Sequence, residues 1–142
     1  MRIGDVLTQK PTGVLTVEPE TPVPSLLTAL AARGVGAAVV ADADGAVVGM
    51  VSERDVVRHL HHRGAALLAD SVSSIMSGHV TTCGPDDEVD ALAAIMTERR
   101  IRHIPVVENG KLTGIVSIGD VVKNRLDELE AHRSQLEAYI AG

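Results

Sequence analysis

A seven-residue motif occurs twice in this chain of 142 residues and limits the folds that the chain can adopt. Residues 49–55 read Gly-Met-Val-Ser-Glu-Arg-Asp, and residues 114–120 read Gly-Ile-Val-Ser-Ile-Gly-Asp. In each copy a short apolar run leads to a serine, and an aspartate follows three positions later. A serine at a helix N-cap and an acid at the third helical position form a capping box. Each motif therefore predicts a strand that passes directly into a helix.

The residues before each motif also match, which indicates an internal duplication. The apolar helix face that begins at Val23 reappears at Val89, a shift of 66 positions (89 − 23). The motif itself is shifted by 65 positions (114 − 49), so the first hairpin turn is one residue longer. Agreement in register over a whole half indicates two copies of one β-α-β-β-α unit. Because a unit of this size is too small to bury its own sheet, we expect the copies to pack as a pseudo-twofold pair.

Hydrophobic periodicity and turn residues predict the same order of elements in each half. In the first half we expect an amphipathic segment within 1–12, a strand over 14–17, a helix over 22–34, strands over 35–41 and 47–51 around a turn at 42–45, and a helix over 52–62. In the second half we expect a strand over 80–83, a helix over 86–99, strands over 101–107 and 112–116 around a turn at 108–110, and a final helix. We assign residues 1–62 and 72–126 to the two repeats, 63–71 to a linker and 127–142 to a helical extension.

The composition argues against several classes of partner. A formal charge of −6 lacks the broad basic surface that nucleic-acid binding requires, although it allows a local basic pocket. The single cysteine, Cys83, cannot form a disulfide framework, and we interpret it as a small buried apolar residue. No apolar run reaches the length of a signal segment or a membrane span. We therefore expect a cytoplasmic protein that binds neither nucleic acid nor membrane.

Three histidines, His59, His61 and His62, lie near the expected end of the helix that follows the first motif. His59 and His62 can share a helix face with Asp55 one turn back, which makes a metal site one interpretation. Imidazoles on an exposed helix end are the commoner arrangement. We therefore predict no metal site here.

The order of elements and the two Gly-x-Val-Ser-x-x-Asp motifs resemble a tandem cystathionine-β-synthase (CBS) domain pair, also called a Bateman module. The strand sequence Ile-Arg-His-Ile-Pro-Val-Val at 101–107 adds to this resemblance. The resemblance covers about residues 3–126 and is greatest to stand-alone bacterial proteins that consist of one such pair. It implies an α/β (α+β) fold in which two βαββα repeats pack with pseudo-twofold symmetry, with an extended C-terminal helix.

The resemblance also implies clefts between the repeats that bind adenosine-containing nucleotides such as AMP, ATP or NAD(H). Carried over by position, Asp55 and Asp120 would hold ribose hydroxyls, and Ser52 and Ser117 would lie beside the sugar or phosphate. Backbone groups would contact the adenine edge at Val35, Gly36, Ala37, Arg102, His103 and Ile104. The remaining implied residues are Thr16 and Thr82 along the cleft walls, and Arg102 and His103 at the phosphates, with Arg54, Arg99 or Arg100 nearby.

The two halves differ at the positions that would meet a phosphate. The second repeat has Arg102 and His103 where the first has Gly36 and Ala37, and Arg54 has a glycine as its counterpart. We therefore predict two non-equivalent clefts. The alternative interpretation of the basic run at 97–103 is a solvated helix end, whose arginines oppose the dipole at the helix C-terminus.

Apolar residues continue at heptad spacing beyond the second motif and predict a long final helix. They are Val122, Leu126, Leu129, Leu136 and Ile140, with Arg133 at the skipped position. Such a stripe either packs back on its own domain or forms the seam of a homodimer, and we favour the homodimer because the repeats offer too little surface to cover it.

We compare three classes of function. The favoured class is a non-catalytic sensor that binds an adenine nucleotide and signals to an unidentified protein partner through its dimer geometry. The alternatives are a purely structural dimerisation adaptor and a nucleotide-processing enzyme. The sequence contains no Walker-type loop, no Gly-x-Gly-x-x-Gly after a strand and no cluster of carboxylates for two metals, so we assign no catalytic residue.

Overall fold

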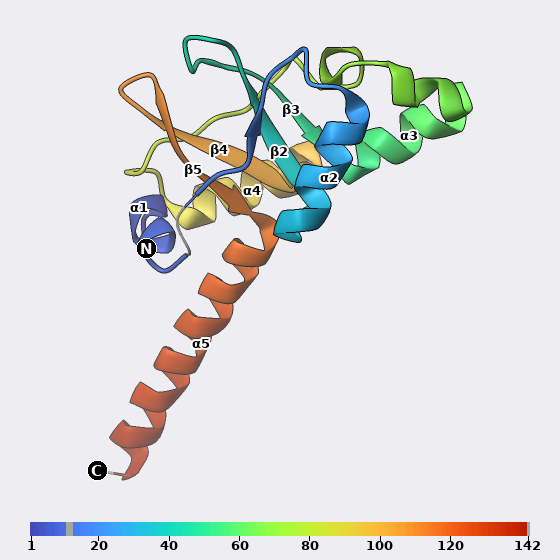
Figure 1. The fold of residues 1–142 in the computed structure, drawn as a ribbon. Helices are drawn as coiled ribbons and strands as arrows, with labels where there is room; N and C mark the ends of the chain where they lie inside the picture. Colours follow the sequence, from blue (N-terminus) through green and yellow to red (C-terminus); the bar gives the residue numbers. More distant parts are fainter. Residues whose placement is uncertain (11–12, 142) are drawn as a thin grey trace.

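The strands form two small sheets, one in each half of the chain (Figure 1). The computed structural model describes residues 1–10 and 13–141. The first sheet has the order β1-β2-β3 and contains β1 (Thr16–Val17), β2 (Ala37–Ala41) and β3 (Val47–Ser52). The second contains β4 (His103–Glu108) and β5 (Lys111–Ser117). β1 pairs parallel to β2, and both hairpins are antiparallel. The expected α/β (α+β) fold is confirmed.

Helices precede and follow each hairpin, as the duplication predicts. The α-helices are α1 (Ile3–Thr8), α2 (Val23–Arg33), α3 (Glu53–Arg63), α4 (Val89–Arg99) and α5 (Ile118–Ala141), and two short 3₁₀ helices are η1 (Gly64–Ala69) and η2 (Val72–Ser74). The predicted apolar faces are buried at equivalent positions in both copies, namely Val23, Leu26 and Leu30 in α2, and Val89, Leu92 and Met96 in α4. The turn between β4 and β5 contains Asn109 and Gly110, both with positive φ, which is typical of a tight two-residue hairpin.

The segment before α4 differs from the prediction. The strand expected over 80–83 is reduced to a single bridge, in which Cys83 pairs with Val106. The pairing ends there because a turn begins at Gly84, whose N–H donates to Oδ2 of Asp87 at 2.8 Å. This turn occupies the residues that were expected to begin the helix, so α4 starts at Val89 instead of residue 86.

Each half has its own apolar core, but each core includes a segment that precedes or follows the other half. Ile3 and Val6 of α1 are buried in the core of the second half, although α1 comes before the first. Leu67, Val72 and Ile75 are buried in the core of the first half, although they follow it. Residues 63–71 therefore do more than connect two units, because Leu67 is wholly buried there. We call the segments 3–8 and 72–77 the exchanged segments.

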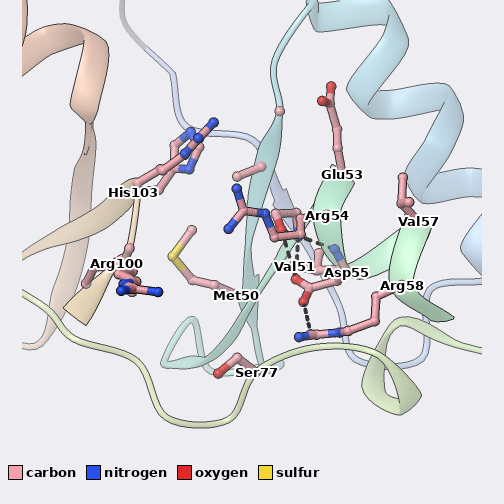
Figure 2. A pocket seen from close by; sticks show the side chains of 15 residues that line it. Met50, Val51, Glu53, Arg54, Asp55, Val57, Arg58, Ser77, Arg100 and His103 are labelled. Atoms are coloured by element: carbon pink, nitrogen blue, oxygen red, sulfur yellow. Dashed lines mark hydrogen bonds and ion pairs between the residues drawn. The ribbon is translucent and has the colours of Figure 1, made fainter. Parts of the chain in front are cut away.

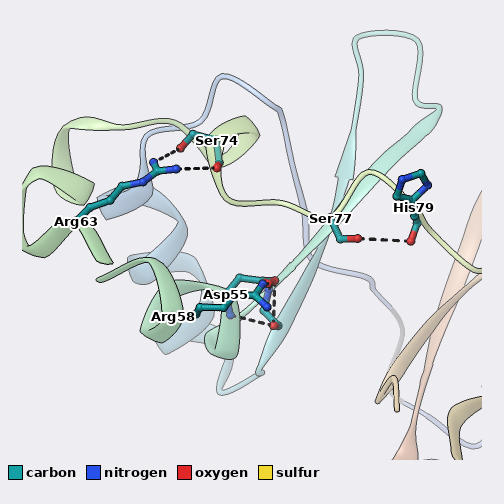
Figure 3. A network of polar contacts seen from close by, with 7 residues as sticks. Asp55, Arg58, Arg63, Ser74, Ser77 and His79 are labelled. Carbon is teal, nitrogen blue, oxygen red and sulfur yellow. Dashed lines mark hydrogen bonds and ion pairs between the residues drawn. The ribbon is translucent and has the colours of Figure 1, made fainter. Parts of the chain in front are cut away.

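A network around Arg63 holds the connection between the halves against the end of α3 (Figure 3). Nη1 of Arg63 donates to Oδ2 of Asp70 at 2.9 Å and to Oγ of Ser74 at 3.2 Å. Its Nη2 donates to the carbonyl oxygen of Ser74 at 3.3 Å. One guanidinium thus fixes both η1 and η2, which places the second exchanged segment over the first core.

The glycine that opens each seven-residue motif allows an exchanged segment to pack directly against the hairpin. A Cβ atom on Gly49 would lie 2.8 Å from the carbonyl oxygen of Ser77, and one on Gly114 would lie 2.7 Å from Cδ2 of Leu7. Both separations are shorter than non-bonded contacts allow. At Gly49 the obstacle is a backbone carbonyl, so packing alone requires glycine there, whereas at Gly114 the Leu7 side chain would have to shift.

The helix α5 extends away from both sheets for most of its length (Figure 1). Val121 and Asn124 are buried, whereas every described residue from Arg125 to the end of α5 is exposed, so the interpretation that this helix packs back on its own domain is wrong. The apolar stripe is among the exposed residues, and Leu129 is 58% exposed. Within residues 1–10 and 13–141, no helix is long and apolar enough to span a lipid bilayer.

Candidate functional site

A cavity of about 790 Å³ lies where the two halves meet. The first half contributes the start of β2, the end of β3 and the first turn of α3, and the second half contributes residues 100–103. Figure 2 shows His103 and Arg100 on one side, Asp55 and Arg58 on the other, and Met50 between them. The volume falls within the range of pockets that hold small organic ligands.

The first seven-residue motif forms the predicted capping box at the wall of this cavity. Oδ2 of Asp55 accepts from the backbone N–H of Ser52 at 2.8 Å and from its hydroxyl at 3.1 Å. Oδ1 of Asp55 accepts from Nη2 of Arg58 at 2.8 Å. The Asp55 side chain is 14% exposed, whereas that of Arg58 is 60% exposed. Oδ2 of Asp55 is thus fixed by the helix cap, whereas Oδ1 is bonded to a largely solvent-exposed arginine, Arg58.

The opposite wall carries positive charge from the second half. Arg100, Arg102 and His103 line the cavity, and Arg54 adds a further guanidinium from α3. Among the described residues no ion pair within 4 Å forms at Arg54, Arg100 or Arg102. These three guanidinium groups are therefore not neutralised by a direct ion pair, although Glu53 and Asp55 line the same cavity, and they can bind the anionic part of a ligand.

Arg100 occupies an unusual backbone conformation. It caps the C-terminus of α4 with φ 54°, in the left-handed region that favours glycine. The equivalent cap of α2, 66 positions earlier (100 − 34), is Gly34, with φ 61°. A side chain at this cap costs about 1–2 kcal/mol relative to the right-handed conformation. The second copy therefore has an arginine in this strained conformation, lining the cavity, where the first copy has a glycine.

The structure brings together about half of the residues predicted for the clefts. The first cavity is lined by Gly36, Ala37, Ser52, Arg54, Asp55, Arg100, Arg102 and His103. A second cavity, of about 460 Å³, is lined by Val35, Gly36, Ala37, His103 and Ser117 from the predicted set. The predicted residues that line neither cavity are Thr16, Thr82, Arg99, Ile104 and Asp120. The two cavities differ in volume and in their charged residues, because Glu53 and Asp55 line only the first and Lys10 and Arg33 line only the second.

The residues outside the cavities have identifiable other contacts. Ile104 is wholly buried in the core of the second half. Nη1 of Arg99 donates to Oγ1 of Thr81 at 2.9 Å. Thr16 lies in the short edge strand β1 and pairs with Val39, and Thr82 is an exposed residue beside the single bridge at Cys83.

Several lining residues were not predicted from the sequence. Arg58 lies three positions after Asp55 on a helix, so the spacing alone places both side chains on one face. Ser77 comes from an exchanged segment, and no local pattern indicates its position. The other unpredicted lining residues of the first cavity are Met50, Val51, Glu53, Val57 and Ile101.

The second motif also forms a capping box, but its aspartate has a different partner. Oδ2 of Asp120 accepts from the backbone N–H of Ser117 at 2.9 Å and from Nζ of Lys10 at 2.6 Å. Burial alone would raise the pKa of Asp120, but the bonds from Lys10 and Ser117 outweigh it and hold that pKa below its ordinary value. Asp120 is therefore a carboxylate with its charge already compensated inside the protein.

Two other ionisable groups have shifted pKa values. Burial lowers the pKa of His103, and the charge of Lys10 lowers it further, so His103 is neutral at pH 7. Burial raises the pKa of Cys83 to about 11, with a contribution from the Asp87 carboxylate. Cys83 is therefore a protonated thiol and not a nucleophile at neutral pH. In the described part of the chain, no three His, Cys, Asp or Glu side chains lie together as metal ligands would.

Comparison with known proteins gives matches over nearly the whole chain. The CBS domain family matches it twice, at residues 3–62 and 72–127. A CBS-domain containing protein from Agrobacterium tumefaciens is 46% identical with a TM-score of 0.84, and the match covers 87% of this chain and 92% of that one. A CBS domain protein from Pyrobaculum aerophilum, solved in complex with AMP, is 30% identical with a TM-score of 0.75, covering 84% of this chain and 89% of that one.

A mitochondrial CBS domain-containing protein of Arabidopsis thaliana is 36% identical over 99 residues, which are 68% of this chain and 48% of the plant protein. This chain thus spans about half the length of that curated relative. Each family match contains one copy of the seven-residue motif. The chain belongs to the CBS domain family and is a tandem pair of CBS domains followed by a long C-terminal helix.

Proposed function

We propose that this CBS domain pair is a non-catalytic regulatory module that binds an adenosine-containing nucleotide, such as AMP, ATP or NAD(H), in the first cavity. The observation that carries the proposal is that one cavity joins the carboxylate of Asp55 from the first half to a cluster of cations from the second. A nucleotide presents complementary groups, because it has a diol at one end and phosphate at the other. The AMP complex of the Pyrobaculum aerophilum relative supports the same ligand class.

The ribose is assigned to the corner formed by Ser52 and Asp55. Oδ1 of Asp55 exchanges its bond from Arg58 for a ribose hydroxyl, and this exchange is inexpensive because exposed ion pairs contribute about 0–1 kcal/mol. Oδ2 keeps its bonds to Ser52, so the cap of α3 persists while the ligand is bound.

The phosphate is assigned to the cations of the second half. Arg100 and Arg102 offer guanidinium groups that match phosphate oxygens in pairs, and His103 supplies a neutral imidazole that can donate one hydrogen bond. Arg54 adds a cation from the first half. The adenine then lies along the backbone of Gly36 and Ala37 and the side chain of Met50.

Binding of this kind works as a switch, because the two ends of the ligand contact different halves. A bound nucleotide stabilises the arrangement in which the halves are close, by as much as its affinity differs between arrangements. A ligand at a hundred-fold excess over its Kd adds about 2.7 kcal/mol of stability. The proposed setting is cytoplasmic, and the signal is read by a separate protein partner. The alternatives are a structural adaptor with empty clefts and a nucleotide-processing enzyme.

A single experiment separates the three classes. The purified chain is incubated with AMP, ATP and NADH plus magnesium, the nucleotides are followed by chromatography, and thermal unfolding is recorded in parallel. We expect at least one nucleotide to raise Tm while every nucleotide is recovered unchanged. An unchanged Tm with all three would favour the adaptor. Turnover that disappears in the Asp55→Ala protein, and so is not due to a contaminant, would establish an enzyme.

We propose further that the chain is a homodimer with a seam along α5. The exposed apolar stripe of Val122, Leu126, Leu129, Leu136 and Ile140 follows heptad spacing. The stripe continues beyond the last residues that the domain pair covers, so a second copy of the same helix is a self-complementary partner. Arg133, which occupies the skipped position of the stripe, forms an ion pair with Glu137 at 3.0 Å along the same helix.

The seam is tested by substitutions that leave helix propensity nearly unchanged. We expect Leu129→Gln with Leu136→Gln to convert the dimer to monomer in light scattering at micromolar concentration, because both seam contacts become polar. The matched control carries Ala131→Gln and Ala138→Gln, which place the same number of glutamines on the opposite face of the helix and should leave the mass unchanged. A dimer of equal strength in both proteins would assign the interface to the domain pair instead of α5.

A further inference from the structure

The C-terminal caps of α2 and α4 have the same backbone structure. The cap residues, Gly34 and Arg100, are both left-handed, with φ and ψ of 61° and 35° at Gly34 and of 54° and 42° at Arg100. In each copy the N–H of the following residue donates to the carbonyl oxygen five positions earlier, at 3.2 Å in the first copy and 3.1 Å in the second. This bond is typical of a Schellman motif, which places a left-handed residue at the cap.

Glycine is the residue that this conformation favours, and the second copy departs from it. A side chain in the left-handed region brings its Cβ atom close to the following carbonyl oxygen. Crowding by neighbours is not involved at the first cap, because a Cβ atom on Gly34 would meet no atom within 4 Å. Within residues 1–10 and 13–141, the non-glycine residues with positive φ are Arg100 and Asn109. Asparagine tolerates this conformation better than other side chains do, so Arg100 is the strained one of the two.

The side chain of Arg100 gains no ion pair that would offset the strain. In the part of the chain that the structure describes, Arg100 is exposed and has no carboxylate within 4 Å of its guanidinium. It lines the first cavity (Figure 2), whereas Gly34 lines neither cavity. Strained backbone conformations of this kind cluster at ligand sites. A ligand in the first cavity is therefore a partner that can offset the strain.

The chemistry of the guanidinium indicates which part of a ligand it contacts. Its planar N–H groups match the oxygens of a phosphate in pairs, whereas an uncharged sugar or base cannot use its charge. The nucleoside part is assigned to Asp55 and to Gly36 and Ala37 on the other wall. Arg54 and Arg102 also line this cavity, but neither has a positive φ. Arg100 is thus the cation whose position in the cavity lowers the stability of the fold.

We infer that Arg100 is a specificity-determining residue that makes the first cavity select a phosphorylated nucleoside over the uncharged nucleoside, and that it does so at a cost in stability to the ligand-free protein. The inference rests on the proposed nucleotide function. The two equivalent caps then have different roles. Gly34 only ends α2, whereas Arg100 ends α4 and also binds the phosphate.

The test measures ligand preference and stability in the same variant. The Kd values of AMP and adenosine are measured by calorimetry on the full chain, and Tm is measured without ligand. The unmodified protein should bind AMP at least about ten-fold more tightly than adenosine. Arg100→Gly should weaken AMP binding by about ten-fold and leave adenosine binding unchanged. It should also raise the Tm of the ligand-free protein by about 2–4 °C, because the backbone strain is relieved.

Two variants separate the backbone effect from the binding effect. Asn109→Gly also replaces a left-handed residue by glycine, in the turn between β4 and β5, and Asn109 lines neither cavity. It should leave both Kd values unchanged. Gly34→Ala adds a Cβ atom at the equivalent cap, so it should lower Tm and leave the affinity for AMP unchanged.

An Arg100→Gly protein that prefers AMP as strongly as the unmodified protein does would overturn the inference, and so would one whose Tm falls. Equal affinity of the unmodified protein for AMP and adenosine would also overturn it, but the proposed function would stand because AMP is bound. Failure of the proposed function is distinguishable, because the unmodified protein would then bind neither ligand. That result would overturn the inference as well.

Discussion

Replacing Asp55 by alanine should weaken AMP binding by ten-fold or more. The ribose hydroxyls donate to a carboxylate, and hydrogen bonds to charged groups are worth about 1.5–3 kcal/mol. The partly buried position of Asp55 reduces competition from water for those bonds. The change in Kd is measured by isothermal titration calorimetry. Asp44→Ala, which removes an acid from the exposed turn between β2 and β3, is the control and should bind AMP normally.

The substitution also removes a helix cap, so the ligand must be varied as well as the protein. We expect 2′-deoxy-AMP to bind the unmodified protein several-fold more weakly than AMP. In Asp55→Ala the two ligands should bind alike, because the group that distinguishes them is absent. This cycle separates the ribose contact from the loss of the bonds that the Asp55 carboxylate accepts from Ser52. Equal affinity of both ligands for the unmodified protein would remove Asp55 from the ribose site.

Replacing Ile3 by alanine should destabilise the second half of the molecule, although Ile3 precedes the first half in the sequence. Ile3 is fully buried in the second core, and truncation of such a side chain to alanine costs about 2–5 kcal/mol. Thermal or denaturant unfolding gives the size of the loss. Amide hydrogen exchange should show reduced protection in β4, β5 and α4.

Ile75→Ala is the matched comparison, because Ile75 is equally buried but belongs to the first core. Its loss should reduce protection in β2, β3 and α2. Ile3→Ala should thus weaken the second half of the molecule, and Ile75→Ala should weaken the first half. Reduced protection in β2 and β3 on truncation of Ile3 would show that the exchanged packing is incorrect.

Much of the fold was predictable because its determinants are local and occur twice. The spacing of Val23 and Leu26 fixes the buried face of α2, and the same spacing recurs in α4. The capping boxes depend on residues three positions apart. The exchanged packing was not predictable in this way, because the periodicity of Ile3 and Val6 indicates an apolar face but not which core covers it.

The site was predictable where the duplication could be followed by position. Comparison of Gly34 with Arg100 shows that an arginine occupies a cap where the first copy has a glycine, although the left-handed backbone itself emerged only from the structure. Ser52 and Asp55, which were assigned from the first motif, line the first cavity. Asp120 was assigned by its equivalence to Asp55, and no local pattern indicates the ion pair with Lys10, which joins residues 110 positions apart.

The exchanged segments impose an order on how this protein forms during synthesis. Residues 3–8 leave the ribosome roughly 80 positions before α4, the first helix of the core that they complete (89 − 8). The core of the first domain likewise lacks Leu67, Val72 and Ile75 until the residues after α3, the last α-helix of that domain, have been synthesised. Neither domain can finish folding as a nascent unit, and contacts between such distant segments form slowly. A ribosome that stalls between the two repeats would therefore expose the apolar face of α1, a surface that chaperones or proteases recognise in incomplete chains.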